Sequence, residues 1–433
     1  MARRDPAPPF RRGVQAVIGV LAAAYIALIP LARPHLPANL HIADLLFPLL
    51  AIATLYRHRG PWQLRPLDYA VIAYLIALLP SFLVTDDVRA SGFELVKRLY
   101  LAAVYAVFAI YFRSEGYRVA FKAIVYGAIS LCVVGLAATL AYLLAHVSAP
   151  QILFVMPIPY FGTGPRLWLF TETPAMLANY LTFALPFLVT ARFAGFLGPR
   201  AWIGSLGAVA TAVMLTVSHS IAGFVTAGVA AVWPVARGDR AHALRAAGVV
   251  ATVVVIFVLN AMLVVTIRRV DWGTDFDKSV PRPVGQSIYE FQQDEGAQRL
   301  NLQVSYNPMN YYLLKRVAWR AFLERPWTGF GLGRFRVLTN RAVDERRIHD
   351  AYRVADPHST LLGALAETGL IGALATVAVF GTALVPWRRP DGSPARWFVV
   401  ASQAAIIGLA VNGLNADVMN FRFLWVGLAV LRN

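Results

Sequence analysis

Long apolar runs alternate with short polar loops along most of the chain. Their approximate spans are 14–32, 41–56, 69–85, 97–112, 123–146, 175–191, 202–217, 220–236, 246–267, 360–386, 397–414 and 418–431. A helix needs roughly 20 residues to cross the hydrocarbon core of a bilayer, and most of these runs reach or approach that length. The pattern predicts an all-α polytopic membrane protein with about twelve transmembrane helices.

A long polar segment, residues 268–357, interrupts the pattern between the ninth and tenth runs. It contains two stretches with helical spacing of apolar residues, 311–324 and 335–352. Between them, Gly329, Gly331 and Gly333 predict a tight turn that folds the loop back onto the membrane. We therefore expect three parts, which are membrane helices in 1–267, an extramembrane loop at 268–357 and membrane helices in 358–433.

A shorter interruption lies near residues 150–166. Its apolar stretch, 152–160, is too short to span a bilayer, so we expect a re-entrant or interfacial segment. Arg166 follows this stretch, and such a segment would hold it near the lipid headgroups.

Composition agrees with the pattern. Of the 433 residues, 58% are hydrophobic and 15% are charged, and the mean hydropathy is +0.57. A soluble protein of this size needs more charged residues to cover its surface. Composition therefore excludes an ordinary soluble domain.

The basic residues are distributed unevenly over the loops. The two termini and the loops on their side of the predicted helices carry 19 of the 40 Lys and Arg residues, and the opposite short loops carry 6. The other 15 lie in 268–357, and long translocated segments do not follow the charge rule. The distribution predicts that both termini are cytoplasmic and that the long loop faces the other compartment.

The formal net charge of +17 would suggest a nucleic-acid partner for a soluble domain, but topology accounts for most of it here, and we expect none. On the translocated side, Arg98, Arg166 and Arg316 have no topological reason to be basic, which predicts an anionic ligand. Guanidinium groups bind phosphate oxygens in a two-pronged manner, so a pyrophosphate fits them. Contact with the headgroups of membrane lipids would also explain these residues, and both interpretations stay open.

The sequence Asp356-Pro-His358-Ser359 comes directly before the tenth apolar run. A neutral imidazole at this surface can accept a proton from a hydroxyl, which makes His358 a candidate general base. Asp356 could orient its ring, and Ser359 is a candidate helix N-cap. Alternatively, His358 is only a polar residue at a helix start.

Glu367 falls inside the tenth apolar run, where a carboxylate is costly and needs a partner. Either it pairs structurally with an Arg or a backbone donor, or it supports the site. Glu367 comes nine positions after His358, a spacing that places the two side chains on opposite faces of a continuous helix. Asp275 and Asp277 have the spacing of metal-binding carboxylates in many glycosyltransferases, although two acids in a polar loop also occur by chance. We expect no metal and no cofactor.

Three motifs in residues 311–372 resemble a known family when they are read together. They are Arg316-x-x-Trp-x-x-Phe, Pro326-x-x-Gly-x-Gly-x-Gly-x-Phe335, and His358-Ser-x-Leu followed by Glu367-x-Gly-x-x-Gly372. This combination is similar to the shared signature of bacterial O-antigen ligases, O-antigen polymerases and protein O-oligosaccharyltransferases. The chain departs from the family pattern at Ser218-His-Ser220 and at Glu172-Thr-Pro174.

The resemblance implies a lipopolysaccharide O-antigen ligase in the inner membrane of a Gram-negative bacterium, with a periplasmic site. His358 matches the family's essential His, Arg316 its loop Arg, and Arg166 the Arg before the sixth span. The implied partners are undecaprenyl-pyrophosphate-linked O-antigen and the lipid A-core oligosaccharide. The alternatives are an O-antigen polymerase, another lipid-linked-oligosaccharide transferase, and a lipid-linked-glycan transporter without catalysis.

Overall fold

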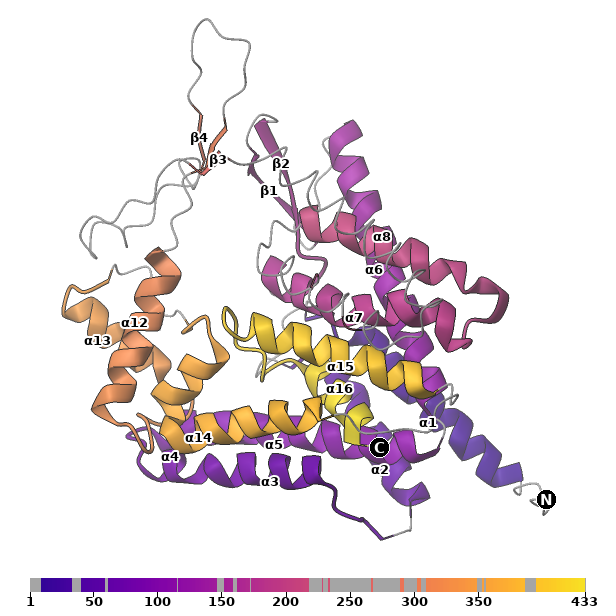
Figure 1. Cartoon of the computed structure of the whole chain (residues 1–433), viewed down its shortest axis with the longest axis horizontal. Helices are drawn as coiled ribbons and strands as arrows, with labels where there is room; N and C mark the ends of the chain where they lie inside the picture. The colour runs from indigo at the N-terminus through magenta and orange to yellow at the C-terminus, as the bar shows by residue number, and fades with distance from the viewer. Residues whose placement is uncertain are drawn as a thin grey trace, which may run out of the picture.

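In the computed structural model, the protein forms a predominantly helical bundle (Figure 1). The structure describes residues 9–32, 40–58, 61–114, 116–145, 152–158, 162–171, 173–217, 309–348, 353, 356–385 and 395–432, with short pieces at 228, 233, 266–267, 289–291 and 302–304. The first group of helices is α1 (Pro9–Leu28), α2 (Ile42–Arg57), α3 (Pro66–Ala77), α4 (Leu79–Leu83), α5 (Val88–Tyr111), α6 (Tyr117–Ala145), α7 (Pro174–Ala194) and α8 (Trp202–Val217). The second group is α12 (Met309–Glu324), α13 (Phe335–Asp344), α14 (Thr360–Leu384), α15 (Ala395–Asn412) and α16 (Arg422–Arg432). Short 3-10 turns lie at Phe112–Ser114 and Gly198–Arg200.

The apolar runs expected before residue 218 and after residue 359 all coincide with helices. Among the described residues, five helices are long and apolar enough to cross a membrane, namely Pro66–Leu83, Tyr117–Ala141, Pro174–Ala194, Thr360–Leu384 and Ala395–Asn412. The expected spans at 220–236 and 246–267 lie almost entirely outside the described residues. The helical membrane-protein class is thus supported, and the count of twelve spans stays a prediction.

Helix α7 lies at the centre of the bundle, packed between α8, α6 and α15. Phe121 of α6, Phe187 of α7 and Phe398 of α15 are buried, and their ring centroids lie 5.7–6.0 Å apart. Aromatic contacts of this kind add about 0.5–1.5 kcal/mol each beyond the area they bury. The outer helices instead expose apolar side chains such as Leu45 and Leu49 of α2, as a lipid-facing surface would.

The two ends of the bundle are held by different contacts. At one end, Arg432 in α16 binds Asp68 in the first turn of α3, with Nε 3.0 Å from both carboxylate oxygens. At the other end, the Ser81 hydroxyl of α4 donates to the Glu367 carbonyl of α14 at 2.8 Å. The end of α16 and the beginning of α14 therefore lie at opposite ends of the bundle.

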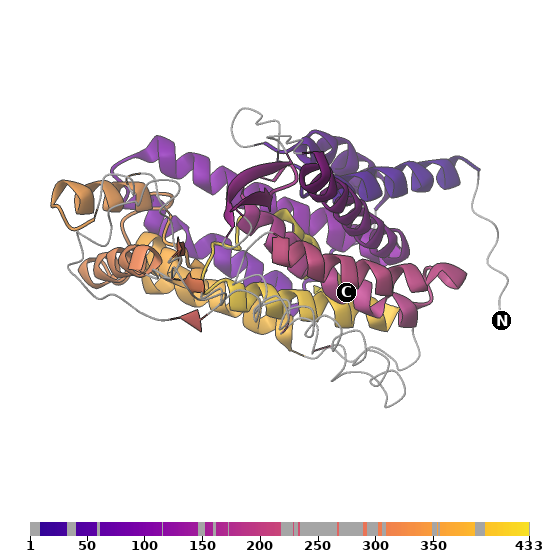
Figure 2. The same ribbon diagram turned by 90° about the horizontal axis from the view of Figure 1, so that it is seen from above.

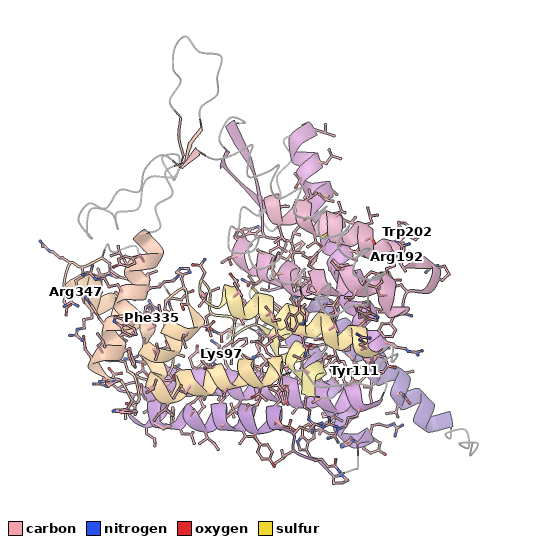
Figure 3. All side chains as sticks on the ribbon, viewed as in Figure 1. Lys97, Tyr111, Arg192, Trp202, Phe335 and Arg347 are labelled. Atoms are coloured by element: carbon pink, nitrogen blue, oxygen red, sulfur yellow. The ribbon has the colours of Figure 1, made fainter. Side chains whose placement is uncertain are left out.

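The figures show the same separation. Helices α12 and α13 lie at the end of the bundle far from the beginning of α1 (Figures 1 and 2). Figure 3 shows Phe335 and Arg347 at this end, and Tyr111 and Arg192 towards the other. Which compartment each end faces stays a prediction.

Two small sheets accompany the helices. Strands β1 (Leu153–Ile158) and β2 (Gly162–Leu167) form an antiparallel pair in which Leu153 lies opposite Leu167. This hairpin occupies the expected re-entrant or interfacial segment, whose relation to a membrane stays a prediction. The second sheet has the order β3-β5-β4, with β3 (Thr266–Ile267), β4 (Tyr289–Phe291) and β5 (Leu302–Val304).

The expected helices of the long loop are both present. Helix α12 includes the stretch 311–324, but α13 ends at Asp344 and not at Tyr352. Arg346 adopts φ 54°, a left-handed conformation that stops the helix. The predicted length of the second helix was therefore wrong.

Candidate functional site

His358 lies immediately before helix α14. The Ser359 hydroxyl accepts from the Leu362 N–H at 3.4 Å, a long contact that places Ser359 at the N-cap. His358 itself adopts φ 44°, in the left-handed region that non-glycine residues rarely occupy. The Asp356 carboxylate accepts from the His358 N–H at 2.8 Å, and Pro357 before it is buried. This strained backbone, held by its neighbours, is typical of functional positions.

The His358 ring lies in a half-buried, charged environment. Burial lowers the pKa of His358, the nearby Asp356 carboxylate opposes this effect, and the Lys315 ammonium adds to it. Ring Nδ1 lies 3.4 Å from Asp356 Oδ1. Because the lowered pKa favours the neutral ring near pH 7, His358 can accept a proton there.

Helix α12 contributes Lys315 to the surroundings of His358. The Lys315 Nζ lies 3.4 Å from the Asn415 Oδ1, and burial lowers its pKa. The sequence gave no indication that Lys315 lies close enough to His358 to affect its ring. Arg316, the next residue, lies half-buried on the same helix.

The turn between α15 and α16, residues 413–421, packs against the beginning of α14. Three hydrogen bonds join the turn to Thr360. The Thr360 N–H donates to the Gly413 carbonyl at 2.7 Å, and the Thr360 hydroxyl donates to the Ala416 carbonyl at 2.8 Å. The same hydroxyl accepts from the Val418 N–H at 2.9 Å. The α15–α16 turn is therefore fixed two residues from His358.

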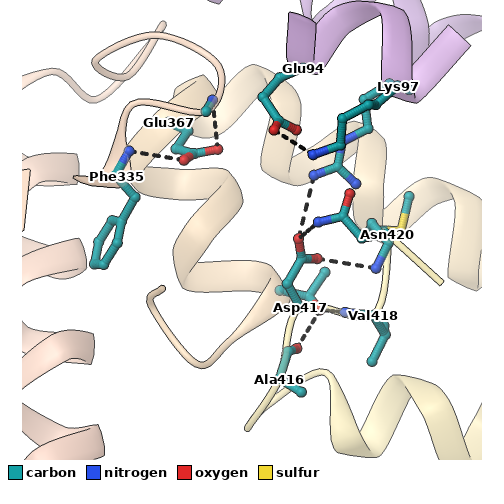
Figure 4. Close-up of polar contacts among 12 residues, drawn as sticks. Glu94, Lys97, Phe335, Glu367, Ala416, Asp417, Val418 and Asn420 are labelled. Carbon is teal, nitrogen blue, oxygen red and sulfur yellow. Dashed lines mark hydrogen bonds and ion pairs between the residues drawn. The ribbon is translucent and has the colours of Figure 1, made fainter. Parts of the chain in front are cut away.

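The same turn reaches Arg98 of α5 through Asp417, which Figure 4 shows beside Ala416, Val418 and Asn420 of the turn. Arg98 is only 7% exposed, and its Nη2 lies 3.4 Å from Asp417 Oδ2. Within the described residues, its Nε and Nη1 have no hydrogen-bond partner. Asp417 also accepts from the Asn420 amide at 2.6 Å and from the Met419 N–H at 3.1 Å. Arg98 thus combines burial with unused donors, which is unusual for a guanidinium.

Glu367 lies in α14, nine positions after His358, and its side chain reaches the beginning of α13. Its carboxylate accepts from the Gly333 N–H at 3.1 Å and the Phe335 N–H at 3.0 Å (Figure 4). The partner expected for this carboxylate is therefore a pair of backbone donors. A supporting role in the reaction stays a prediction.

The structure brings the candidates together only in part. Arg98 contacts the α15–α16 turn through Asp417, and His358 lies two residues before Thr360, which bonds to the same turn. Helix α12, which carries Arg316, packs against α14. Arg166 lies in β2 opposite Phe154, and its side chain is outside the described residues. Residues 218–220, Glu172, Asp275 and Asp277 also lie outside them.

Comparison with known proteins agrees with the motifs. A family model described as O-Antigen ligase matches residues 205–377, which include Arg316, His358 and Glu367. No curated protein matches the chain. The match supports glycosyltransferase activity of the O-antigen ligase or polymerase type on lipid-linked glycans, in a membrane protein. The resemblance to the O-antigen ligase family is thereby confirmed for residues 205–377.

Proposed function

We propose that this protein is a lipopolysaccharide O-antigen ligase of the inner membrane. It transfers a glycan from undecaprenyl pyrophosphate to a sugar hydroxyl of the lipid A core on the periplasmic face. The observation that carries this proposal is the half-buried His358 with a lowered pKa, held beside a turn that also contacts a buried, incompletely paired Arg98.

The reaction is a single displacement. His358 accepts the proton of the acceptor hydroxyl, or orients it, while the hydroxyl oxygen attacks the anomeric carbon of the donor. The bond from that carbon to the pyrophosphate oxygen breaks, and undecaprenyl pyrophosphate leaves. The proton on His358 then passes to solvent. Displacement from the opposite side inverts the configuration at the anomeric carbon.

The arginines act on the leaving group. Negative charge grows on the pyrophosphate as the bond breaks, and fixed cations stabilise it most in the transition state. Arg316 and Arg166 are assigned this role, with Arg98 as a third cation. Asp356 orients the His358 ring.

The proposed reaction needs no metal, because the donor already carries a good leaving group and side chains supply the cations. Activity should therefore persist in EDTA. Loss of activity in EDTA that a divalent ion restores would assign Asp275 and Asp277 as metal ligands.

Two other functions remain distinguishable. A polymerase would extend the glycan on the lipid carrier, and a transporter would move it without chemistry. Transporters usually place functional charges near the bilayer midplane between repeated halves. An assay of the purified protein with donor lipid and core acceptor separates all three functions. Glycan joined to the acceptor indicates a ligase, and longer lipid-linked chains indicate a polymerase. The absence of any covalent product indicates a transporter.

The sharpest genetic test is His358→Ala. It should abolish ligation while the protein remains folded and inserted, since general bases contribute roughly 10²- to 10⁴-fold in rate. Normal O-antigen-capped lipopolysaccharide in cells carrying only this variant would refute the proposal.

A further inference from the structure

The loop between α12 and α13 packs directly on helix α14. We call residues 326–334 the docking loop. Its backbone bonds to α14 in three places, from the Phe330 N–H to the Ala366 carbonyl at 3.0 Å, from the Gly331 N–H to the Glu367 carbonyl at 3.0 Å, and from the Leu370 N–H to the Pro326 carbonyl at 2.7 Å. The two segments therefore meet backbone to backbone.

Two glycines make this approach close. Gly329 has φ 66°, and a Cβ there would lie 2.3 Å from the Glu367 carbonyl carbon. Gly369 has φ 65° and breaks the regular helix, and a Cβ there would lie 2.3 Å from the Trp327 carbonyl carbon. Only glycine fits both positions, so the contact depends on these two residues.

The Glu367 side chain completes the contact. It accepts two backbone N–H bonds, from Gly333 and Phe335, at the start of α13. The N-cap residue of α13, Arg334, makes no side-chain capping bond of its own. The Glu367 carboxyl group from α14 thus caps the beginning of α13, where the helix dipole favours an oxygen acceptor.

The apolar contacts between these helices are limited. Helices α12 and α13 share a small core with α14, in which Leu314, Ala318 and Phe335 pack near Ala366. The main core of the bundle is separate from this cluster. Backbone and polar bonds at the docking loop therefore add to the attachment that this small core provides.

We propose that Glu367 is a positioning residue that holds α12 and α13 on α14, so that α12, with Lys315 and Arg316, keeps its place beside the helix that follows His358. The inference rests on the proposed function for its catalytic consequence. Lys315 and Arg316 are on α12, and His358 precedes α14, so the relative placement of these two helices sets the distance between the cations and the imidazole. Glu367 acts on that placement and does not touch the substrate.

The attachment is tested first without activity. Trypsin should cleave after Arg334 at least tenfold faster in Glu367→Ala than in the wild type, because the docking loop loses its cap. Cleavage after exposed Arg347 gives the internal reference. Glu324→Ala, which removes an exposed carboxylate paired with Arg341 on the same helices, is the matched control and should leave cleavage after Arg334 unchanged.

Kinetics then test positioning. We expect Glu367→Ala to lower kcat/KM at least 30-fold, and Glu367→Gln less than 10-fold, since an amide oxygen still accepts one N–H bond. In a background that carries both Lys315→Ala and Arg316→Ala, Glu367→Ala should cost less than threefold, because all three changes act through the same two cations. A merely structural role would cost the same in both backgrounds.

The inference is overturned if Glu367→Ala keeps activity within threefold of the wild type, or if cleavage after Arg334 is unchanged. It is also overturned if the loss is undiminished in the background that carries both Lys315→Ala and Arg316→Ala. Absence of product from the wild type would instead refute the proposed function, and the trypsin comparison would still decide the attachment.

Discussion

Two arginine–aspartate pairs in this bundle, each with a buried arginine, are built in different ways. In the first, Arg432 binds both oxygens of Asp68 at 3.0 Å and donates to the Gln63 carbonyl at 2.6 Å. Its guanidinium also stacks on Trp62, 4.3 Å from the ring centre. Asp68 additionally accepts from the Tyr105 hydroxyl at 2.8 Å. This pair has the many bonds that a buried ion pair needs to offset its desolvation.

The second pair joins Arg98 and Asp417 at a single distance of 3.4 Å. Two of the three guanidinium nitrogens have no partner among the described residues. Asp417 is held by Met419 and Asn420 from its own turn, and so does not depend on Arg98. The comparison teaches that the same two residue types form a many-bonded structural tie in one place and leave guanidinium donors unused in the other, where we propose that the donor pyrophosphate binds.

The largest expected effect concerns the first pair. Arg432→Ala leaves a buried Asp68 without its cation, which should destabilise the fold by about 3–5 kcal/mol. Thermal unfolding of the purified protein measures this, and the folded fraction should keep its specific activity within threefold. Wild-type stability of this variant would remove the distinction between the pairs.

The second pair should show the opposite behaviour. Arg98→Ala should lower the rate of transfer by roughly 10²- to 10³-fold, as loss of one preorganised donor to a developing anion does. Its thermal stability should change little, because Asp417 keeps its other bonds. If Arg98→Ala unfolds as readily as Arg432→Ala, Arg98 is a structural residue.

A smaller effect is expected in the pH profile of kcat/KM. In the proposed mechanism the neutral His358 ring is the active form, so activity should fall as pH falls through its pKa. Lys315→Met removes a positive neighbour, raises the pKa of His358 and should move the acid limb to higher pH. Asp356→Asn removes a negative neighbour and should move the limb to lower pH. Shifts in the same direction would contradict the assignment of these neighbours.

The smallest effect should come from an exposed pair. Arg341 binds Glu324 at 2.8 Å and Glu345 at 3.0 Å, with its side chain about half exposed. Arg341→Ala should change stability by less than about 1 kcal/mol and leave activity unchanged, because solvent screens such pairs. A larger loss would mean that exposure does not separate the pairs as we describe.

Much of the helical architecture could be predicted from the sequence, because apolar runs and their spacing are local signals. Helix α12 and the glycine turn after it were expected, as was a partner for Glu367. Helix α13 was predicted too long because Arg346 carries no glycine-like signal for its left-handed backbone. The hairpin of β1 and β2 also gave no clear local pattern.

The site was predictable only where motifs marked it. His358 and Arg316 stand in recognisable motifs, but Asp417, Thr360 and Lys315 were not identified. Arg98 and Asp417 are 319 positions apart, and Thr360 is 58 positions from Val418. Such contacts arise from the packing of helices, which periodicity does not specify.

Donor binding to an inactive protein tests the central claim most directly. In His358→Ala, the affinity for undecaprenyl-pyrophosphate-linked glycan can be measured without turnover. We predict near wild-type binding in that variant and at least 30-fold weaker binding when Arg98→Ala is added. Equal affinity of the single and double variants would contradict the claim that Arg98 and His358 serve one site.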